Sequence, residues 1–254
     1  MPTALVLSPH LDDAAFSCGG LMACLADAGW RVCMATAFTR SVHPASGFAL
    51  ACQLDKGLAP DIDYMALRRE EDRVAADHLG VSDLRWLDLP EAPHRGYGSA
   101  AALFGPVHDG DDIWRELAAM ISSLVNELQP SLVLAPQGLG DHVDHRQTIR
   151  AVNHAAPGGP LAFYRDTPYA IRNLLGVPHV AVRGLVQSVA GIAAGLDRKV
   201  SASCAYTSQI GFQFGGAEAT GRALREFARR EGEGRPAERF LGLVPLPASL
   251  LLQD

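Results

Sequence analysis

No stretch of the 254-residue chain approaches the roughly 18 consecutive apolar residues that a membrane-spanning helix needs. The N-terminus also lacks a basic segment ahead of an apolar core, which argues against export. Lysine and arginine form no purely basic cluster, and the net charge is -6, which argues against a nucleic-acid surface. These absences predict a cytoplasmic protein that neither spans a membrane nor binds nucleic acid.

Cysteine is also scarce, and its five residues include no Cys-x-x-Cys pair. This spacing favours free buried thiols in a reducing compartment over a disulfide framework. No Gly-x-Gly-x-x-Gly pattern follows the first apolar run, which argues against a nucleotide-binding protein. The one arginine-rich segment, residues 222 to 239, is interleaved with glutamates and is typical of a solvated helix face.

What is present predicts a single α/β domain, because apolar runs alternate with helical patterns along a chain long enough to bury a full core. The order favours a Rossmann-like, mostly parallel β-sheet flanked by helices. We expect strands near residues 3–7, 31–38, 84–89, 131–135 and 161–164, and helices near 20–28, 67–79, 113–128 and 146–154. Residues 39–65 are expected to be a long surface loop with room for one helical turn, and residues 90–110 another long loop; long loops in compact domains are often functional.

The last third of the chain predicts additions to this domain instead of a second one. We expect strands near 179–182 and 240–244, and helices near 196–206 and 217–230. The chain is therefore described as one domain over residues 1–254, with a core of about 1–165 and a C-terminal elaboration of about 166–254.

Two polar segments follow predicted strands, where open parallel sheets bind their ligands. The first is Ser8-Pro9-His10-Leu11-Asp12-Asp13, with Gly19-Gly20 six residues on. The second is Asp141-His142-Val143-Asp144-His145. Taken alone, the first segment would be interpreted as a helix cap and the second as a solvated loop. Together, at the ends of two strands of one sheet, they predict a metal site.

The side chains of the two segments are expected to have different chemical roles. His10 and Asp13 can turn toward one point, so Asp12 faces elsewhere and is free to act as a general base on a water molecule. One imidazole of the second segment would complete the site, and the other would stabilise an oxyanion or protonate a leaving group, oriented by Asp144. Zn²⁺ suits such a mixed nitrogen and oxygen set, although Fe²⁺ or Mn²⁺ would suit it too.

These motifs resemble the LmbE-like or PIG-L-like N-deacetylases, a family of zinc-dependent enzymes with a Rossmann-like fold. The resemblance rests on Pro9-His10-Leu11-Asp12-Asp13 with Gly19-Gly20, and on His142-Val143-Asp144-His145. Between them, Arg68-Arg69-Glu70-Glu71 and Leu79-Gly80 are similar to the Arg-x-x-Glu helix of the family. Weaker similarity extends to the segment around Lys199 and Tyr206, so the resemblance covers most of the chain.

The resemblance implies a role for each of these positions. His10, Asp13 and His145 would be the metal ligands, and Asp12 the general base. His142 would be the electrophilic or acid partner, held by Asp144, and Arg68 would reach the substrate or brace the site. The implied reaction is hydrolysis of the acetamide of an amino sugar to a free amine and acetate.

The sequence departs from the family pattern at positions that are not implied ligands. Leu11 and Val143 stand where many members have proline, and Ala14 stands where many have glutamate. Some relatives also have a tyrosine close to the second motif, which Gly138-Leu139-Gly140 does not supply. A tyrosine from another segment would have to take that place: Tyr97, Tyr164 or Tyr169.

The two long loops are expected to close over a small N-acetylated substrate. Glu91, His94 and Tyr97 are the substrate-binding candidates, because they follow a predicted strand end directly. An amino sugar or a glycoside carrying one is favoured, since the loops lack the basic cluster that a multiply phosphorylated lipid would need.

Two alternatives remain. One is a related zinc amidohydrolase that acts on a non-sugar N-acyl compound. The other is a non-catalytic metal-binding module, against which the spare carboxylate of Asp12 argues. The sequence leaves open whether the chain forms a homo-oligomer.

Overall fold

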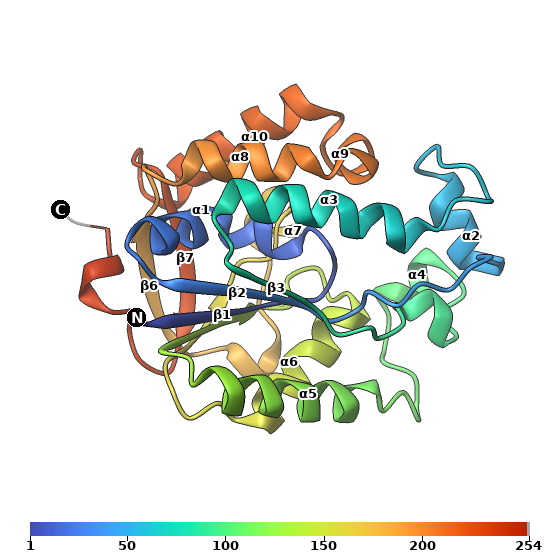
Figure 1. Ribbon diagram of the computed structural model, residues 1–254, viewed down its shortest axis with the longest axis horizontal. Helices are drawn as coiled ribbons and strands as arrows, with labels where there is room; N and C mark the ends of the chain where they lie inside the picture. Colours follow the sequence, from blue (N-terminus) through green and yellow to red (C-terminus); the bar gives the residue numbers. More distant parts are fainter. Residues whose placement is uncertain (253–254) are drawn as a thin grey trace.

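Seven strands form one sheet, in the order β3-β2-β1-β4-β5-β7-β6, in the computed structural model, which describes residues 1–252 (Figure 1). β1 to β5 are parallel, and β7 runs antiparallel between β5 and β6. The strands are β1 (Thr3–Ser8), β2 (Arg31–Thr36), β3 (Asp83–Trp86), β4 (Leu132–Pro136), β5 (Leu161–Tyr164), β6 (Val186–Gly191) and β7 (Ala237–Gly242). The predicted α/β fold with a mostly parallel sheet is therefore confirmed.

Helices cover both faces of the sheet (Figure 1). One face carries α1 (Asp13–Asp27), α3 (Tyr64–Leu79), α8 (Leu196–Ala205) and α10 (Ala217–Glu231), and the other carries α5 (Ile113–Leu128) and α6 (Val143–Ala155). The shorter helices are α2 (Gly47–Leu54), α4 (Ala100–Leu103), α7 (Tyr169–Arg172) and α9 (Thr207–Phe214). Three 3-10 turns complete the list: η1 (Ala92–Arg95), η2 (Val180–Val182) and η3 (Ala248–Leu250).

The sheet divides the apolar interior into two cores, because successive side chains of a strand point to opposite faces. In β1, Ala4 and Val6 join the core beneath α1, α3 and α8, whereas Leu5 and Leu7 join the core beneath α5 and α6. β1 is thus buried on both sides, as expected for the centre of a parallel sheet. Its carboxyl end is held in place from both faces.

Helix α1 begins at Asp13, earlier than predicted, and is interrupted at Cys18, whose φ of -123° is not helical. The interruption frees backbone donors, and the carboxylate of Glu238 accepts hydrogen bonds from the N–H groups of Gly20 and Leu21 at 3.0 and 2.9 Å. Lys199 pairs with Glu238 and donates to the carbonyl of Ser17. A Cβ atom at Gly20 would lie 2.5 Å from the side chain of Ile192, so this glycine permits the close approach.

Several sequence predictions were wrong in detail. The loop expected at 39–65 contains helix α2, and the loop expected at 90–110 contains α4. The strand expected at 179–182 is the 3-10 turn η2, and the true strand is β6, whose first two residues are exposed. Edge strands with few buried residues carry a weak apolar pattern, which explains the error.

The C-terminal residues extend the same sheet, since β6 and β7 continue it beyond β5. The division of the chain at about residue 165 stays a prediction. Over residues 1–252, no helix combines the length and apolar character needed to cross a bilayer.

Candidate metal and catalytic centre

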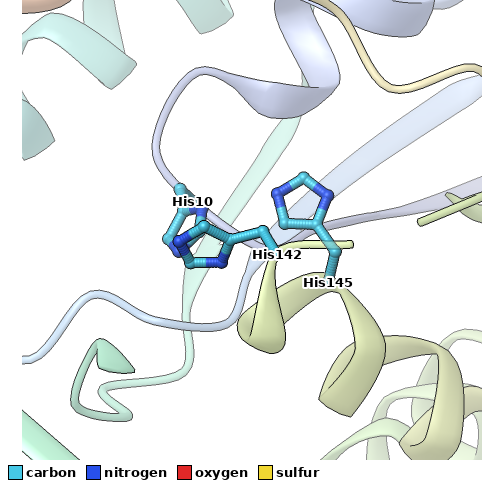
Figure 2. A group of neighbouring side chains, drawn as sticks. All are labelled: His10, His142 and His145. Carbon is cyan, nitrogen blue, oxygen red and sulfur yellow. The ribbon is translucent and has the colours of Figure 1, made fainter. Parts of the chain in front are cut away.

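The two polar segments meet at the carboxyl ends of β1 and β4, as predicted for neighbouring parallel strands. His10 lies on the loop between β1 and α1, and His142 and His145 lie at the start of α6 (Figure 2). Their ring centroids are 5.0 to 5.6 Å apart. Segments more than 130 residues apart in the chain therefore form one cluster of imidazoles.

Asp12 occupies the N-cap position of α1 but does not cap it, because its side chain makes no capping hydrogen bond. Ser8 does this work instead, since its Oγ accepts a hydrogen bond from the N–H of Ala14 at 3.0 Å. The backbone of Asp12 has a φ of 144°, a conformation that costs a non-glycine residue about 1–3 kcal/mol. Asp12 therefore does not cap the helix, and it lines a cavity that His10 and His142 also line.

Asp13 lies between two of the imidazoles. Its Oδ2 atom is 3.1 Å from Nδ1 of His10 and 3.2 Å from Nε2 of His145. Adjacent ligands of a tetrahedral zinc ion, with bonds of about 2.0–2.1 Å, are about 3.3 Å apart. The spacing of these three atoms suits ligands that share one metal ion.

His145 provides the clearest sign of a metal. Its ring is fully buried, and its Nδ1 atom lies 2.6 Å from the carboxylate of Asp166. Its Nε2 atom is buried without a hydrogen-bond partner, because the contact with Asp13 lacks hydrogen-bond geometry. A carboxylate that holds one ring nitrogen while the other faces a metal is the usual arrangement of a histidine ligand.

Asp144 holds His10, not His142 as the sequence predicted. Its Oδ2 atom lies 2.9 Å from Nε2 of His10 and accepts a hydrogen bond from the N–H of Ala92, while Arg95 donates to its Oδ1 atom. Nδ1 of His142 instead accepts the backbone N–H of Asp144 at 3.2 Å. This bond leaves Nε2 of the neutral His142 ring as the protonated nitrogen.

A second set of donors could hold a metal ion. Ring nitrogens of His10, His142 and His145 all lie within 4.8 Å of one another. The two sets share His10 and His145 and differ in whether Asp13 or His142 is the third ligand. The shorter spacing around Asp13 favours the predicted set.

The charges of the centre shift the pKa of its members. Burial raises the pKa of Asp12 to about 7, against the opposing charge of Arg68. Burial opposes the charged form of Asp13 as well, but His145 and His10 lower its pKa below the usual range. Burial lowers the pKa of His142 to about 3, with a further contribution from His10, so its ring is neutral.

Arg68 braces the site. It donates hydrogen bonds to the carbonyl of Leu11 at 2.7 Å and to the carboxylates of Asp12 and Glu91 at 3.3 and 2.8 Å. Glu91 lines the same cavity. Of the two roles implied for Arg68, bracing is the one for which the contacts are visible.

His94 and Tyr97 do not line the cavity that contains the centre. The Tyr97 ring is fully buried, stacks on His108 at 3.9 Å, and donates a hydrogen bond to Asp111. His94 borders a smaller, separate hollow that Glu91 also lines. The loop that carries them returns toward α5, so the expected substrate contacts are not found.

A cavity of about 320 Å³ opens from the centre. Among the candidate tyrosines, only Tyr169 of α7 lines it, with its ring 5.6 Å from that of His145. Short helices absent from the sequence predictions provide much of its outer wall: Phe48 and Cys52 of α2, Phe104 beside α4, and Gln209 and Phe212 of α9.

Two of the supporting residues, Asp166 and Arg95, escaped the sequence predictions. Asp166 follows the end of β5 by two residues, as His10 follows the end of β1. This place just after a strand was the signal from which Asp166 could have been predicted. Arg95 had none, because a single arginine in a loop is usually solvated.

A cluster of imidazoles and carboxylates in a cavity at the strand ends of an α/β sheet is typical of hydrolases that use a metal ion, and the three imidazoles here could hold one. Residues 5–156 match the family model PIG-L, described as GlcNAc-PI de-N-acetylase. The chain belongs to this family.

Similar proteins agree with this assignment. The chain is 34% identical, over 81% of its length and 72% of the relative, to 2'-N-acetylparomamine deacetylase from Streptomyces fradiae. The crystal structure of the zinc-inhibited form of a teicoplanin deacetylase aligns with a TM-score of 0.81 at 28% identity, covering 94% of this chain and 97% of that one. A deacetylase of the A40926 pseudoaglycone aligns equally well, with a TM-score of 0.81 at 29% identity over 94% and 96% of the two chains. The chain is a hydrolytic N-deacetylase.

Proposed function

We propose that this enzyme hydrolyses the acetamide of an N-acetylated amino sugar, carried on a larger glycoside, to a free amine and acetate. The single observation that carries the proposal is the buried Nε2 atom of His145, which faces Asp13 without a hydrogen-bond partner in a site whose cavity the carboxylate of Asp12 also lines. The relatives are named as deacetylases of 2'-N-acetylparomamine, of teicoplanin and of the A40926 pseudoaglycone, which supports the sugar part of the proposal.

Zn²⁺ is the proposed metal, with His10, Asp13 and His145 as its ligands. Two of these are oriented by a second carboxylate, His145 by Asp166 and His10 by Asp144. When bound, such an ion polarises the carbonyl of the acetamide and lowers the pKa of a water molecule. Fe²⁺ or Mn²⁺ would suit the same donors.

Asp12 is the proposed general base. Asp12 lines the cavity together with Asp13, and Arg68 pairs with its carboxylate at 3.3 Å. A carboxylate in this position takes the proton of the attacking water and passes it toward the leaving nitrogen. The strained backbone of Asp12 is consistent with a side chain positioned for chemistry at some cost in stability.

His142 is the proposed electrophilic partner. Because its Nδ1 accepts the N–H of Asp144, its Nε2–H donates a hydrogen bond to the oxygen of the acetamide as negative charge develops there. Phe104, whose ring lies 5.3 Å from that of His142, shields this hydrogen bond from water.

The test is a panel of acetylated substrates with the metal removed and restored. We expect acetate and amine to be released from N-acetylglucosamine and its glycosides, to stop after chelation, and to return on addition of Zn²⁺, Fe²⁺ or Mn²⁺. Release only from N-acyl amino acids or other non-sugar amides would refute the sugar assignment. Full activity after verified removal of all metal would refute the metal-dependent mechanism.

A further inference from the structure

Lys56 is a cation in the cavity wall without an anionic partner. Of the two lysines in the chain, Lys199 forms a buried ion pair with Glu238 at 2.7 Å. Lys56 donates only to the carbonyl of Cys52, at 2.9 Å, and no carboxylate of residues 1–252 lies within 4.0 Å of it. Burial, and then the charge of Arg68, lower the pKa of Lys56. A partly desolvated ammonium in a cavity is stabilised by an acceptor from a ligand.

Two aromatic rings flank this ammonium. Nζ of Lys56 lies 5.4 Å from the ring centroids of both Tyr64 and Phe212, within the range of a cation–π contact. The hydroxyl of Tyr64 accepts a hydrogen bond from Gln209 at 2.9 Å, which fixes the ring. Phe212 is 61% exposed, and an exposed aromatic ring on a cavity wall is typical of a binding surface.

The helix that carries Phe212 is anchored to α3. The carboxylate of Glu71 accepts hydrogen bonds from Thr207 Oγ1, Ser208 N–H and Ser208 Oγ, each at 2.7 Å, at the start of α9. Glu71 lies one helical turn from Arg68, which braces the catalytic loop. One face of α3 therefore holds both the catalytic loop and the aromatic wall, so their separation is set by a single rigid helix.

We propose that Lys56, Tyr64 and Phe212 form a second subsite, which binds the group joined to the amino sugar. That group presents a flat apolar ring to the aromatic side chains and an anionic oxygen, such as an aryl carboxylate, to Lys56. The proposal rests on the proposed function, because it assigns the part of the substrate that lies beyond the acetylated sugar.

The chemistry of the wall distinguishes this occupant from a long N-acyl chain, the other apolar group that a deacetylase could meet. An acyl chain packed here would desolvate the Lys56 ammonium further and offer it no acceptor. A ring with a carboxylate provides both the apolar surface and the acceptor. We therefore assign the group joined to the amino sugar (the aglycone), and not the N-acyl group, to this subsite.

The experiment compares kcat/KM for amine release from N-acetylglucosamine, its phenyl glycoside and its 4-carboxyphenyl glycoside, each glycoside as both anomers, with N-octanoylglucosamine as the acyl arm. We expect the phenyl group to raise kcat/KM about fivefold through ring contacts. We expect the carboxylate to raise it about tenfold more through a charge-assisted hydrogen bond. N-octanoylglucosamine should not exceed the free N-acetyl sugar.

Variants separate the two contacts. Lys56→Met should reduce the gain from the carboxylate to below twofold, and Lys56→Arg should restore most of it, because the charge is kept. Phe212→Ala should reduce the gain from the phenyl ring. The matched control is Arg150→Met, which removes an exposed cation 4.1 Å from the ring centroid of Trp114, away from the cavity, and should leave every ratio unchanged. Metal content is measured for each variant.

The outcomes distinguish this proposal from the proposed function. Equal kcat/KM for the three N-acetyl substrates would overturn the subsite while the deacetylase activity stands. Preference for N-octanoylglucosamine, unaffected by Lys56→Met, would overturn it in favour of an acyl site. Failure to release amine from any sugar substrate would overturn both proposals.

Discussion

The cavity has an inner half around His10, Asp13 and Asp144 and an outer half around Lys56 and Phe212. The two halves are built in opposite ways. In the inner half, Asp144 is fully buried and its carboxylate contacts His10, Ala92 and Arg95 at once. In the outer half, Lys56 makes one hydrogen bond and Phe212 is largely exposed. Several hydrogen bonds fix the side chains of the inner half before a ligand binds. The outer half keeps a cation and an exposed ring that a ligand can contact.

The difference has a physical reason. Metal ligands and a general base must keep their geometry within a fraction of an ångström, so they stand at strand ends and are held by further hydrogen bonds. A wall that recognises an attached group needs only a complementary surface, which short helices inserted in loops provide. Substitutions in the inner half should therefore affect turnover or metal affinity, and substitutions in the outer half should affect KM.

Asp12→Asn tests the inner half with the largest expected effect. Turnover should fall about a thousandfold, because the amide cannot accept the proton, while the metal is kept. His145→Ala, in contrast, should lose both turnover and the metal. Metal analysis together with kcat on the same substrate measures this split, and a fully active Asp12→Asn enzyme would show that the base is another residue.

His142→Ala should lower kcat about a hundredfold through loss of the hydrogen bond to the developing oxyanion. Metal content should stay near that of the unmodified enzyme. His154→Ala, at the exposed far end of α6, is the matched control and should change neither quantity. Stoichiometric loss of metal from His142→Ala would instead establish the three-histidine ligand set.

Asp166→Asn should weaken metal binding about 10–100-fold, because His145 loses the carboxylate that orients its ring. Competition with a chelator of known affinity measures the change. Asp72→Asn changes another buried carboxylate, which accepts hydrogen bonds from Trp86 and Tyr206 away from the metal centre. Equal weakening in both variants would attribute the effect to general loss of stability.

Glu71→Gln should have the smallest effect, and it should fall on the outer half. A neutral amide holds the start of α9 less firmly, so we expect KM for an aryl glycoside to rise about fivefold while kcat changes less than twofold. Glu70→Gln alters the neighbouring exposed residue and should leave both constants unchanged. A fall in kcat without a change in KM would place Glu71 with the inner half.

The strand ends explain why the sequence could predict that the two polar segments meet in the inner half. The polar segments at His10 and His142 follow runs that are fully buried in β1 and β4, so the sheet itself brings them together. The expected pairing of Asp144 with His142 was wrong, because neighbours on a helix turn do not face each other. The carboxylate reaches across to His10 instead.

The outer half was harder to predict, because its residues have no shared pattern. Lys56 lies just beyond a helix that was expected to be loop, and Phe212 lies on a helix whose pattern was not recognised. The contact between them depends on how the segment between α2 and α3 lies against α9, and the anchor at Glu71 joins residues more than 130 positions apart. Local periodicity carries no information about such a pair.

The sequence by itself determined the α/β class and the meeting of the two polar segments at neighbouring strand ends, and it predicted separate roles for Asp12 and Asp13, because these follow from burial patterns and from short-range spacing in the chain. Only the tertiary structure decided which carboxylate orients each histidine, that Tyr97 lies outside the cavity, and that Lys56 stands between two rings within it. These features depend on contacts between distant segments, whose geometry is set by packing of the helices on the sheet and is not encoded in any local run of residues.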